Sequence, residues 1–294
     1  MTLHTLRISG LIMLAALLTA CSNIALKAIN TPSYLFSQHD ATRNISYGDA
    51  AHQKLDLYLP NANIQSKNAL VIFVYGGSWT SGQKESYYFI ADALTQHGYS
   101  VAIPDYLKYP EATFPTFVDD IALATAWLLE NGPRYAAQDS VFLMGHSAGA
   151  HTGALLITDP SYLEKHHVAN SSISGFIGLA GPYGFTPKER KFRDIFANLE
   201  NFDVMRPQYH ISGNEPPVLV LHGEADTTVL PVNSHQFSES INANLGTAHS
   251  LFYPDMGHVA ILLALSRVAD RDNSVLYEVL TFLENTQFSQ SITP

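Results

Sequence analysis

The residues best suited to chemistry begin with a serine inside a glycine-framed pentapeptide. Ser147 is the centre of Gly145–Gly149, which lies between an apolar β-type run at 140–144 and an apolar helical run. A serine on a sharp strand-to-helix turn adopts a strained backbone, and its hydroxyl projects clear of the sheet. Such a turn needs very small residues two positions before and after the serine, and Gly145 and Gly149 provide them. The pentapeptide therefore predicts a nucleophilic serine.

A serine hydroxyl is a weak nucleophile at neutral pH, so it requires a general base and a group that orients this base. Asp226 follows the apolar run at 217–222, and His258 follows the last predicted strand. Both side chains would then lie at carboxyl ends of strands, on the same edge of the sheet as Ser147. We expect Ser147 to attack, His258 to transfer the proton and Asp226 to orient the imidazole.

Other acids and histidines near these positions compete for the same roles. Glu224 lies two residues before the favoured aspartate, and Asp255 lies three residues before the favoured histidine. Both therefore stay open as alternative acids.

We interpret His222 as a structural residue at a strand end, and we expect His146 and His151 to point away from the serine hydroxyl.

Acyl transfer also requires donors for the negative charge that develops on the former carbonyl oxygen. The backbone amide of Ala148, directly after the serine, is one predicted donor. We expect the others in Tyr75–Trp79 (Tyr-Gly-Gly-Ser-Trp), which continues from an apolar run at 69–75. Glycines in this segment allow the backbone to approach a substrate closely.

The apolar segments indicate which elements position these residues. Runs such as 69–75 are apolar throughout, which is typical of strands that are buried on both faces of a parallel sheet. Helical segments alternate with such strands, so we predict an α/β fold with a mostly parallel sheet and helices on both faces. Residues 182–213 interrupt this alternation, and we expect them to form a small cap. The predicted strands are 44–48, 54–59, 69–75, 100–106, 140–144, 174–181, 217–222 and 250–253, and the predicted helices are 87–97, 115–129, 150–156, 232–244 and 260–287.

The composition fits a globular domain and narrows the range of partners. The chain has 294 residues, of which 46% are hydrophobic and 14% charged, so it is long enough for one large α/β domain. Its formal net charge is −10, with acidic residues scattered along the chain. An acidic surface without basic clusters argues against nucleic-acid binding.

We expect a small-molecule ester as substrate and no metal or organic cofactor.

The N-terminus resembles a targeting segment. Arg7 precedes an apolar stretch of about a dozen residues, which is the length of a signal peptide and too short to cross a bilayer comfortably. Leu18–Cys21 resembles the bacterial lipobox, in which the cysteine is lipid-modified and becomes the first mature residue, and Ser22 resembles the residue that directs lipoproteins to the outer membrane. Cys21 is also the only cysteine of the chain. The alternative is an ordinary cleaved signal with an incidental cysteine.

These features divide the chain into three parts. We expect residues 1–20 to be a lipoprotein signal peptide, residues 21–42 a tether, and residues 43–288 the folded domain. The protein would then lie in the bacterial cell envelope, held at a membrane through a lipid anchor on Cys21, with the outer membrane favoured.

Taken together, the motifs resemble those of the α/β-hydrolase superfamily, and within it the esterase groups related to hormone-sensitive lipase, kynurenine formamidase and feruloyl esterase. Their His-Gly-Gly-x-Trp motif is similar to Tyr75–Trp79, and their Asp-Tyr-Arg-Leu segment resembles Asp105–Lys108. Ser147–His151 is typical of these groups, and the resemblance covers roughly residues 45–285. It implies an α/β-hydrolase fold with a Ser-Asp-His triad. It also implies that the oxyanion is held by the backbone amides of Gly77, Ser78 and Ala148.

The chain departs from the pattern of these families in two places, which involve three residues. Tyr75 stands where they have histidine, and Leu107–Lys108 stands where they have Arg-Leu. The family histidine usually orders the oxyanion loop, and a tyrosine can do so through its hydroxyl. Neither departure removes a residue of the predicted triad.

The sequence therefore predicts a serine carboxylic ester hydrolase that acts through an acyl-enzyme. Two alternatives stay open. One is an amidase of the arylformamidase type, which uses the same chemistry on a different bond. The other is a non-catalytic, surface-anchored binding protein on the same fold, although such proteins usually lose a member of the triad.

Overall fold

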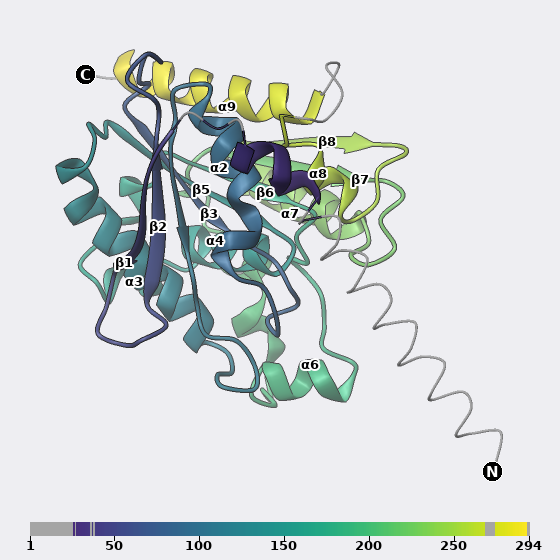
Figure 1. Cartoon of the computed structure of the whole chain (residues 1–294). Helices are drawn as coiled ribbons and strands as arrows, with labels where there is room; N and C mark the ends of the chain where they lie inside the picture. Colours follow the sequence, from purple (N-terminus) through teal and green to yellow (C-terminus); the bar gives the residue numbers. More distant parts are fainter. Residues whose placement is uncertain (1–25, 27, 36, 38, 268–273, 293–294) are drawn as a thin grey trace, which may run out of the picture.

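The computed structural model describes residues 26, 28–35, 37, 39–267 and 274–292 (Figure 1). A sheet of eight strands forms its centre, in the spatial order β1-β2-β4-β3-β5-β6-β7-β8. β1 and β2 pair antiparallel, β2 also pairs antiparallel with β4, and the pairs from β4 to β8 are parallel. The strands are β1 (Asp40–Ser46), β2 (Lys54–Leu59), β3 (Ala69–Val74), β4 (Ser100–Pro104), β5 (Ser140–His146), β6 (Gly175–Leu179), β7 (Val218–Gly223) and β8 (Ala248–Tyr253).

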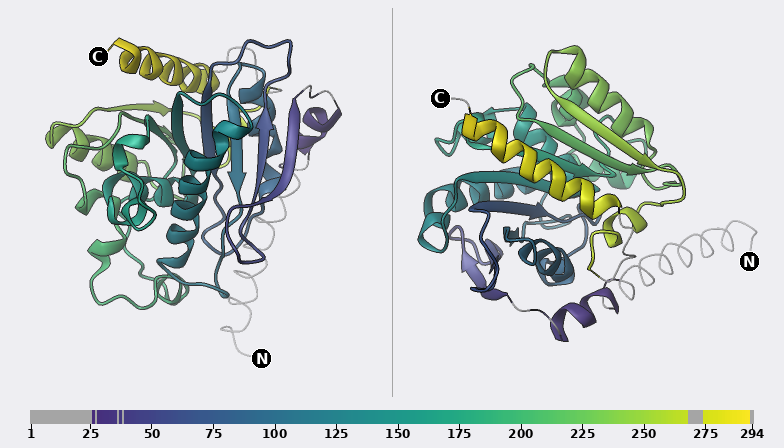
Figure 2. Two further views of the ribbon diagram at one scale, coloured as in Figure 1. Left: turned by 90° about the vertical axis from the view of Figure 1, so that its left-hand side faces the viewer. Right: turned by 90° about the horizontal axis from the view of Figure 1, so that it is seen from above.

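Helices cover both sides of this sheet (Figure 2). α2 packs on β2 and β4, α4 on β5 and β6, α7 on β7 and β8, and α9 on β6 and β7, while α3 packs against α4. The α-helices are α2 (Tyr88–Thr95), α3 (Thr116–Asn131), α4 (Ala148–Thr158), α5 (Ser161–Glu164), α6 (Arg190–Ile195), α7 (Val232–Ala243), α8 (Ala260–Leu263) and α9 (Ser274–Ile292). Short 3-10 turns lie at η1 (Lys84–Tyr87), η2 (Gly132–Arg134), η3 (Asn170–Ser172), η4 (Phe202–Met205) and η5 (Pro207–Tyr209).

The structure confirms the predicted α/β fold. The prediction succeeds because the central strands are buried, as their continuous apolar runs indicated. Every residue of β3, β4, β5, β6 and β7 is buried. A strand inside such a sheet meets helices on both faces, so the side chains on both of its faces are mostly apolar. The two edge strands differ, because β1 is mostly exposed and β8 has only one buried residue.

Parallel register brings the ends of distant strands to one edge of the sheet. Val74 at the end of β3 is level with Gly145 of β5, so the residues that follow β3 lie beside the Ser147 turn. Gly223 at the end of β7 is level with Tyr253 at the end of β8. The loops after these four strands therefore lie at the same edge, which is where ligands bind in open α/β sheets.

The structure differs from the sequence prediction between residues 21 and 42, where we expected a tether. Residues 28–35 are helical, and β1 already begins at Asp40. Asn30 explains the order of this segment, because its buried side-chain amide donates to the carbonyl of Ser86 at 2.7 Å and accepts from the amide of Phe89 at 2.9 Å. The predicted signal peptide and Cys21, the predicted lipidation site, lie outside the described residues.

Residues 182–213, which we expected to form a cap, contain α6 and the turns η4 and η5. In Figure 1, α6 lies at the lower end of the molecule, beyond the sheet. Phe185 and Phe196 of this segment pack against Trp79, with ring centroids 5.5 Å and 4.9 Å from the indole. The segment therefore covers the indole that ends the predicted oxyanion motif.

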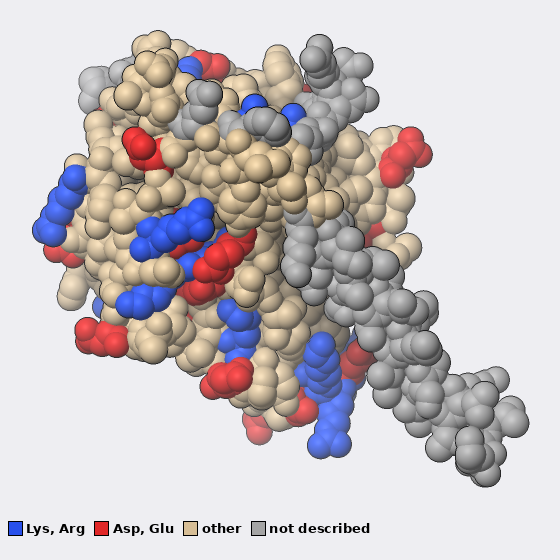
Figure 3. All heavy atoms as spheres, in the orientation of Figure 1, with Lys and Arg blue, Asp and Glu red and all other residues tan. Residues whose placement is uncertain are grey.

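The surface carries charges of both signs. On the face drawn in Figure 3, lysine and arginine side chains are interspersed with aspartate and glutamate side chains. In the part of the chain that the structure describes, none of the helices combines the length and the apolar character needed to span a bilayer.

Candidate active site

Ser147 lies on a strained turn between β5 and α4. Its φ of 55° and ψ of −122° are backbone angles that side-chain-bearing residues rarely adopt. A methyl group on Gly145 would lie 2.5 Å from the carbonyl oxygen of Gly149, and one on Gly149 would lie 2.0 Å from that of Val74. The two glycines are therefore required because the turn is packed tightly against itself and against the end of β3.

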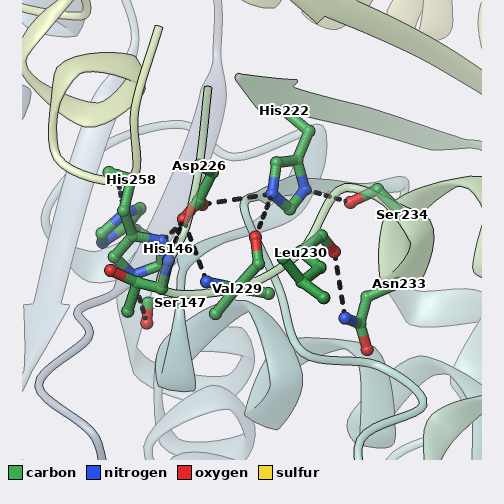
Figure 4. A network of polar contacts seen from close by, with 10 residues as sticks. His146, Ser147, His222, Asp226, Val229, Leu230, Asn233, Ser234 and His258 are labelled. Carbon is green, nitrogen blue, oxygen red and sulfur yellow. Dashed lines mark hydrogen bonds and ion pairs between the residues drawn. The ribbon is translucent and has the colours of Figure 1, made fainter. Parts of the chain in front are cut away.

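The structure brings the three predicted triad residues together (Figure 4). The Ser147 hydroxyl donates to Nε2 of His258 at 2.9 Å, and Nδ1 of His258 donates to Oδ2 of Asp226 at 2.7 Å. The Asp226 carboxylate is fully buried, whereas 13% of the His258 side chain is exposed. This arrangement provides a nucleophile, a base that solvent can reach and a buried acid that fixes the orientation of the base.

The carboxylate of Asp226 is surrounded by four donors. Its Oδ1 accepts from the backbone amides of Thr228 at 2.8 Å and Val229 at 2.9 Å, and its Oδ2 accepts from His258 and from Nε2 of His222 at 3.1 Å. Burial raises the pKa of this carboxyl, but the hydrogen bonds from His222 and His258 outweigh it and hold the pKa well below its ordinary value. Asp226 is therefore ionised at neutral pH.

His222 contacts the triad acid directly, which the sequence analysis did not predict. Its Nε2 lies 3.1 Å from Oδ2 of Asp226 and 2.9 Å from the carbonyl oxygen of Val229, so this nitrogen carries a hydrogen. Its Nδ1 accepts from the Ser234 hydroxyl at 2.7 Å. Figure 4 marks this contact by a dashed line. In the sequence, the sign of this contact is the four-residue spacing from His222 to Asp226. That spacing predicts a contact only if the chain reverses its direction at the end of β7.

The competing acids lie elsewhere. Glu224 and Asp255 are both exposed, while the imidazole of His258 is bonded to Asp226.

In the described part of the chain, no group of three or more histidine, cysteine, aspartate or glutamate residues is placed so as to hold a metal ion.

The imidazoles of His146 and His151 hydrogen-bond to backbone carbonyls and not to the Ser147 hydroxyl. The ring of His146 lies 4.8 Å from that of His258, and its Nε2 donates to the backbone carbonyl of His258 at 2.9 Å. His151 donates from Nε2 to the carbonyl of Met205 at 2.7 Å. Burial lowers the pKa of His146 to about 3 and that of His151 to about 4.

These two buried imidazoles predict an acid-sensitive fold. In the unfolded chain they bind protons below about pH 6.5, whereas in the folded protein they stay neutral until about pH 4 and about pH 3. Protons therefore favour the unfolded state, and each histidine lowers the free energy of unfolding by roughly 1.4 kcal/mol per pH unit as the pH falls from about 6 to about 4. Urea unfolding across this range measures the slope.

A matched pair of variants tests the assignment. His151→Gln removes one of these two buried imidazoles and should flatten the slope. His249→Gln removes an exposed histidine and should leave the slope unchanged. Equal slopes for wild type and His151→Gln would contradict the prediction. Asp226 adds to the slope only at the lower end of this window, because an unfolded aspartate begins to bind protons below about pH 5, whereas the hydrogen bonds of the folded site keep the pKa of Asp226 lower.

The predicted oxyanion segment passes beside the nucleophile. A methyl group on Gly76 would lie 2.9 Å from Cβ of Ser147, so the two backbones are in contact. Gly77, Ser78 and Trp79 have φ of 133°, 53° and 57°, and all three values lie in the left-handed region. Three successive residues of this kind turn the loop sharply against the serine.

The amides of Gly77, Ser78 and Ala148 have no protein acceptor among the described residues. Ala148 is the first residue of α4, where a helix leaves its backbone donors unsatisfied and carries partial positive charge. Free donors near a serine hydroxyl are what a developing oxyanion requires.

The eight-stranded sheet and its strained serine turn define an α/β-hydrolase. More narrowly, the chain belongs to the BD-FAE family, whose model matches residues 55–241. In sequence it is similar to the isoprenylcysteine alpha-carbonyl methylesterase ICME of Arabidopsis thaliana, with 28% identity over 254 residues that cover 79% of this chain and 59% of the relative. Esterase LipQ of Mycobacterium tuberculosis is also 28% identical, over 77% of this chain and 59% of its own length. The chain thus spans about three fifths of these relatives.

Solved structures show the same fold. Esterase B from Lactobacillus rhamnosis superposes with a TM-score of 0.77 over 97% of this chain and 96% of its own, at 18% sequence identity. The apo form of esterase 2 from Thermogutta terrifontis superposes with a TM-score of 0.69 over 87% of this chain and 97% of its own, at 19% identity.

Proposed function

We propose that this protein is a serine carboxylic ester hydrolase that acts through an acyl-enzyme. The observation that carries the proposal is the continuous hydrogen-bonded path from Ser147 through His258 to Asp226, with free backbone amides beside its nucleophilic end. The relatives in sequence are named esterases, which supports ester hydrolysis as the reaction class.

In the first half of the reaction, the Ser147 hydroxyl oxygen attacks the carbonyl carbon of the ester. Nε2 of His258 takes the hydroxyl proton, and the amides of Gly77, Ser78 and Ala148 bind the oxyanion. Collapse of the tetrahedral intermediate breaks the bond to the alkoxy oxygen, and His258 returns the proton to the leaving alcohol. The products are the alcohol and an acyl group on Ser147.

In the second half, a water molecule replaces the alcohol. His258 takes a proton from this water, the resulting hydroxide attacks the acyl carbon, and the same amides bind the second oxyanion. Collapse releases the carboxylic acid and returns the proton to Ser147. Asp226 stays ionised throughout and stabilises the positive charge on the His258 ring, while His222 and the backbone amides of Thr228 and Val229 hold the carboxylate in place.

The proposal is tested with a fluorophosphonate probe and a substrate panel. The panel contains p-nitrophenyl esters of increasing acyl length, N-formylkynurenine, and a methyl ester of an isoprenylated cysteine, which is chosen because of the name of the plant relatives. We expect Ser147 to be labelled and esters to be turned over faster than the formamide. Preferred turnover of N-formylkynurenine would instead indicate an amidase, and folded protein without labelling would indicate a binding protein.

We further propose that Cys21 carries a lipid anchor, because Leu18–Cys21 matches the lipobox pattern and holds the only cysteine of the chain. Two or more acyl chains on this residue would hold the domain firmly at a membrane. Cys21→Ser is therefore expected to move the protein from the membrane fraction to the soluble fraction in a bacterial host, as measured by fractionation and immunoblotting. Ser22→Thr, which keeps the cysteine, is the control. A Cys21→Ser protein that stays in the membrane fraction would refute the anchor.

A further inference from the structure

A bridged ion pair includes the first residue of the predicted oxyanion segment, Tyr75–Trp79, which we call the oxyanion loop. Nζ of Lys108 donates to the Tyr75 hydroxyl at 2.8 Å, and this hydroxyl donates to Oδ1 of Asp105 at 2.6 Å. One phenol therefore connects an ammonium group to a carboxylate. The proposed mechanism uses none of these three side chains, and Tyr75 and Lys108 are two of the positions at which the chain departs from the pattern of related esterases.

The Tyr75 ring supports the loop from within. It is completely buried and stacks between the rings of Tyr87 and Tyr106, at centroid distances of 5.2 Å and 4.7 Å. A methyl group on Gly82 would lie 2.8 Å both from this ring and from the carbonyl oxygen of Gly76. The loop thus closes over the ring, and a displacement of the ring would displace the backbone that follows it.

The segment that holds Lys108 is tied to the loop at a second point. Nζ of Lys108 also donates to the carbonyl of Tyr106 at 2.6 Å, and the Tyr106 hydroxyl donates to the carbonyl of Tyr75 at 2.8 Å. The backbone amide of Lys84, on the far side of the loop, donates to the same Oδ1 of Asp105 at 3.0 Å. Asp105 therefore holds the entry and the exit of the loop together.

The loop requires such support because its backbone is strained. Left-handed angles at the side-chain-bearing residues Ser78 and Trp79 persist only where the surroundings over-determine them. Donors that are fixed before the reaction begins stabilise an oxyanion most effectively, and a small misplacement removes much of this effect.

We propose that Tyr75, Lys108 and Asp105 form one positioning unit that holds the amides of Gly77 and Ser78 in place for the oxyanion. The residues at 75 and 108 are then a matched pair, since the hydroxyl at 75 needs the ammonium group at 108. The inference rests on the proposed function, because it concerns the rate of acyl transfer at Ser147.

The test compares Tyr75→Phe, Lys108→Met and the double variant. Tyr75→Phe keeps the stacked ring and removes only the bridging hydroxyl. We expect kcat to fall about 10- to 100-fold in each single variant, with KM changed less than about twofold, because the donors act mainly on the transition state. The double variant should be no slower than the slower single variant, because residues that act as a unit have non-additive effects.

Tyr58→Phe is a matched control. The Tyr58 hydroxyl is also buried and also donates to a buried aspartate, Oδ2 of Asp56 at 3.1 Å, and this aspartate pairs with Nζ of Lys84 at 3.2 Å. The two groups meet at Lys84, whose ammonium group pairs with Asp56 and whose backbone amide bonds to Asp105, and Tyr58→Phe removes neither of these two contacts. We expect Tyr58→Phe to lower the unfolding temperature while keeping the wild-type kcat.

The rate of labelling by a fluorophosphonate is measured for all variants at a temperature where circular dichroism shows them folded. Slower labelling by Tyr75→Phe and Lys108→Met, with Tyr58→Phe equal to wild type, supports the positioning unit. An active wild type whose kcat and labelling rate are unchanged by Tyr75→Phe overturns it, as does a double variant whose loss is the product of the single losses. A wild type that neither labels nor hydrolyses any ester overturns the proposed function, and the positioning unit with it.

Discussion

Replacement of Ser147 by alanine is expected to lower kcat for p-nitrophenyl esters by about a millionfold while the protein stays folded. Among the described residues, the Ser147 hydroxyl makes one side-chain hydrogen bond, to His258 at 2.9 Å, and it is the group that attacks in the proposed mechanism. Alanine keeps the Cβ that contacts the oxyanion loop, so the strained turn loses little packing. Initial rates and urea unfolding curves measure the two effects.

The control for this variant is Ser161→Ala, which removes an exposed hydroxyl that bonds only to neighbouring Asp159. It should hydrolyse esters at the wild-type rate. If Ser147→Ala retained hydrolysis at a rate near that of wild type and still reacted with a fluorophosphonate, the assignment of the nucleophile would be wrong.

The second large effect is expected at Asp226. Asp226→Asn should lower kcat about ten-thousandfold, because a neutral amide neither selects the Nδ1–H form of His258 nor stabilises its protonated ring. The variant should also be less stable. Each carboxylate oxygen accepts from two donors, so either orientation of the asparagine directs its NH₂ group at two N–H groups. Buried donors left without an acceptor cost about 1–3 kcal/mol each.

Kinetics and calorimetry on the same preparation measure both consequences. Glu224→Gln is the matched control, since Glu224 is exposed and lies two residues away in the same loop. It should change neither rate nor stability. A large loss of kcat in Glu224→Gln, with little loss in Asp226→Asn, would transfer the role of the acid to the competing residue.

The sequence predicts the fold and the triad because both are encoded locally. Strands such as β3 and β5 are continuous apolar runs, and the glycines around Ser147 fit only a tight turn. Asp226 and His258 each follow a predicted strand, so the parallel sheet alone brings them to one edge. No distant contact has to be known for these inferences.

Other parts depend on contacts between segments that are far apart in the chain. Asn30 lies in a stretch that resembled a polar linker, and its order comes from backbone groups of residues 86 and 89. From the sequence alone, His222 looks like any other buried strand residue. It contacts Asp226 because the loop after β7 brings Asp226 back to the end of this strand. The pairing of Tyr75 with Lys108 spans 33 residues and follows no periodic pattern.

His146, the residue before Ser147, affects the electrostatic surroundings of His258, the proposed base. The His146 ring lies 4.8 Å from that of His258, a distance at which two imidazolium ions would repel each other. Because burial lowers the pKa of His146 to about 3, this ring is uncharged at neutral pH. In the proposed acylation step, the cationic ring of His258 would lie beside the anion Asp226, and the neutral His146 would add no positive charge next to it. A substitution that let solvent reach His146 would thus make the base weaker without touching the triad itself.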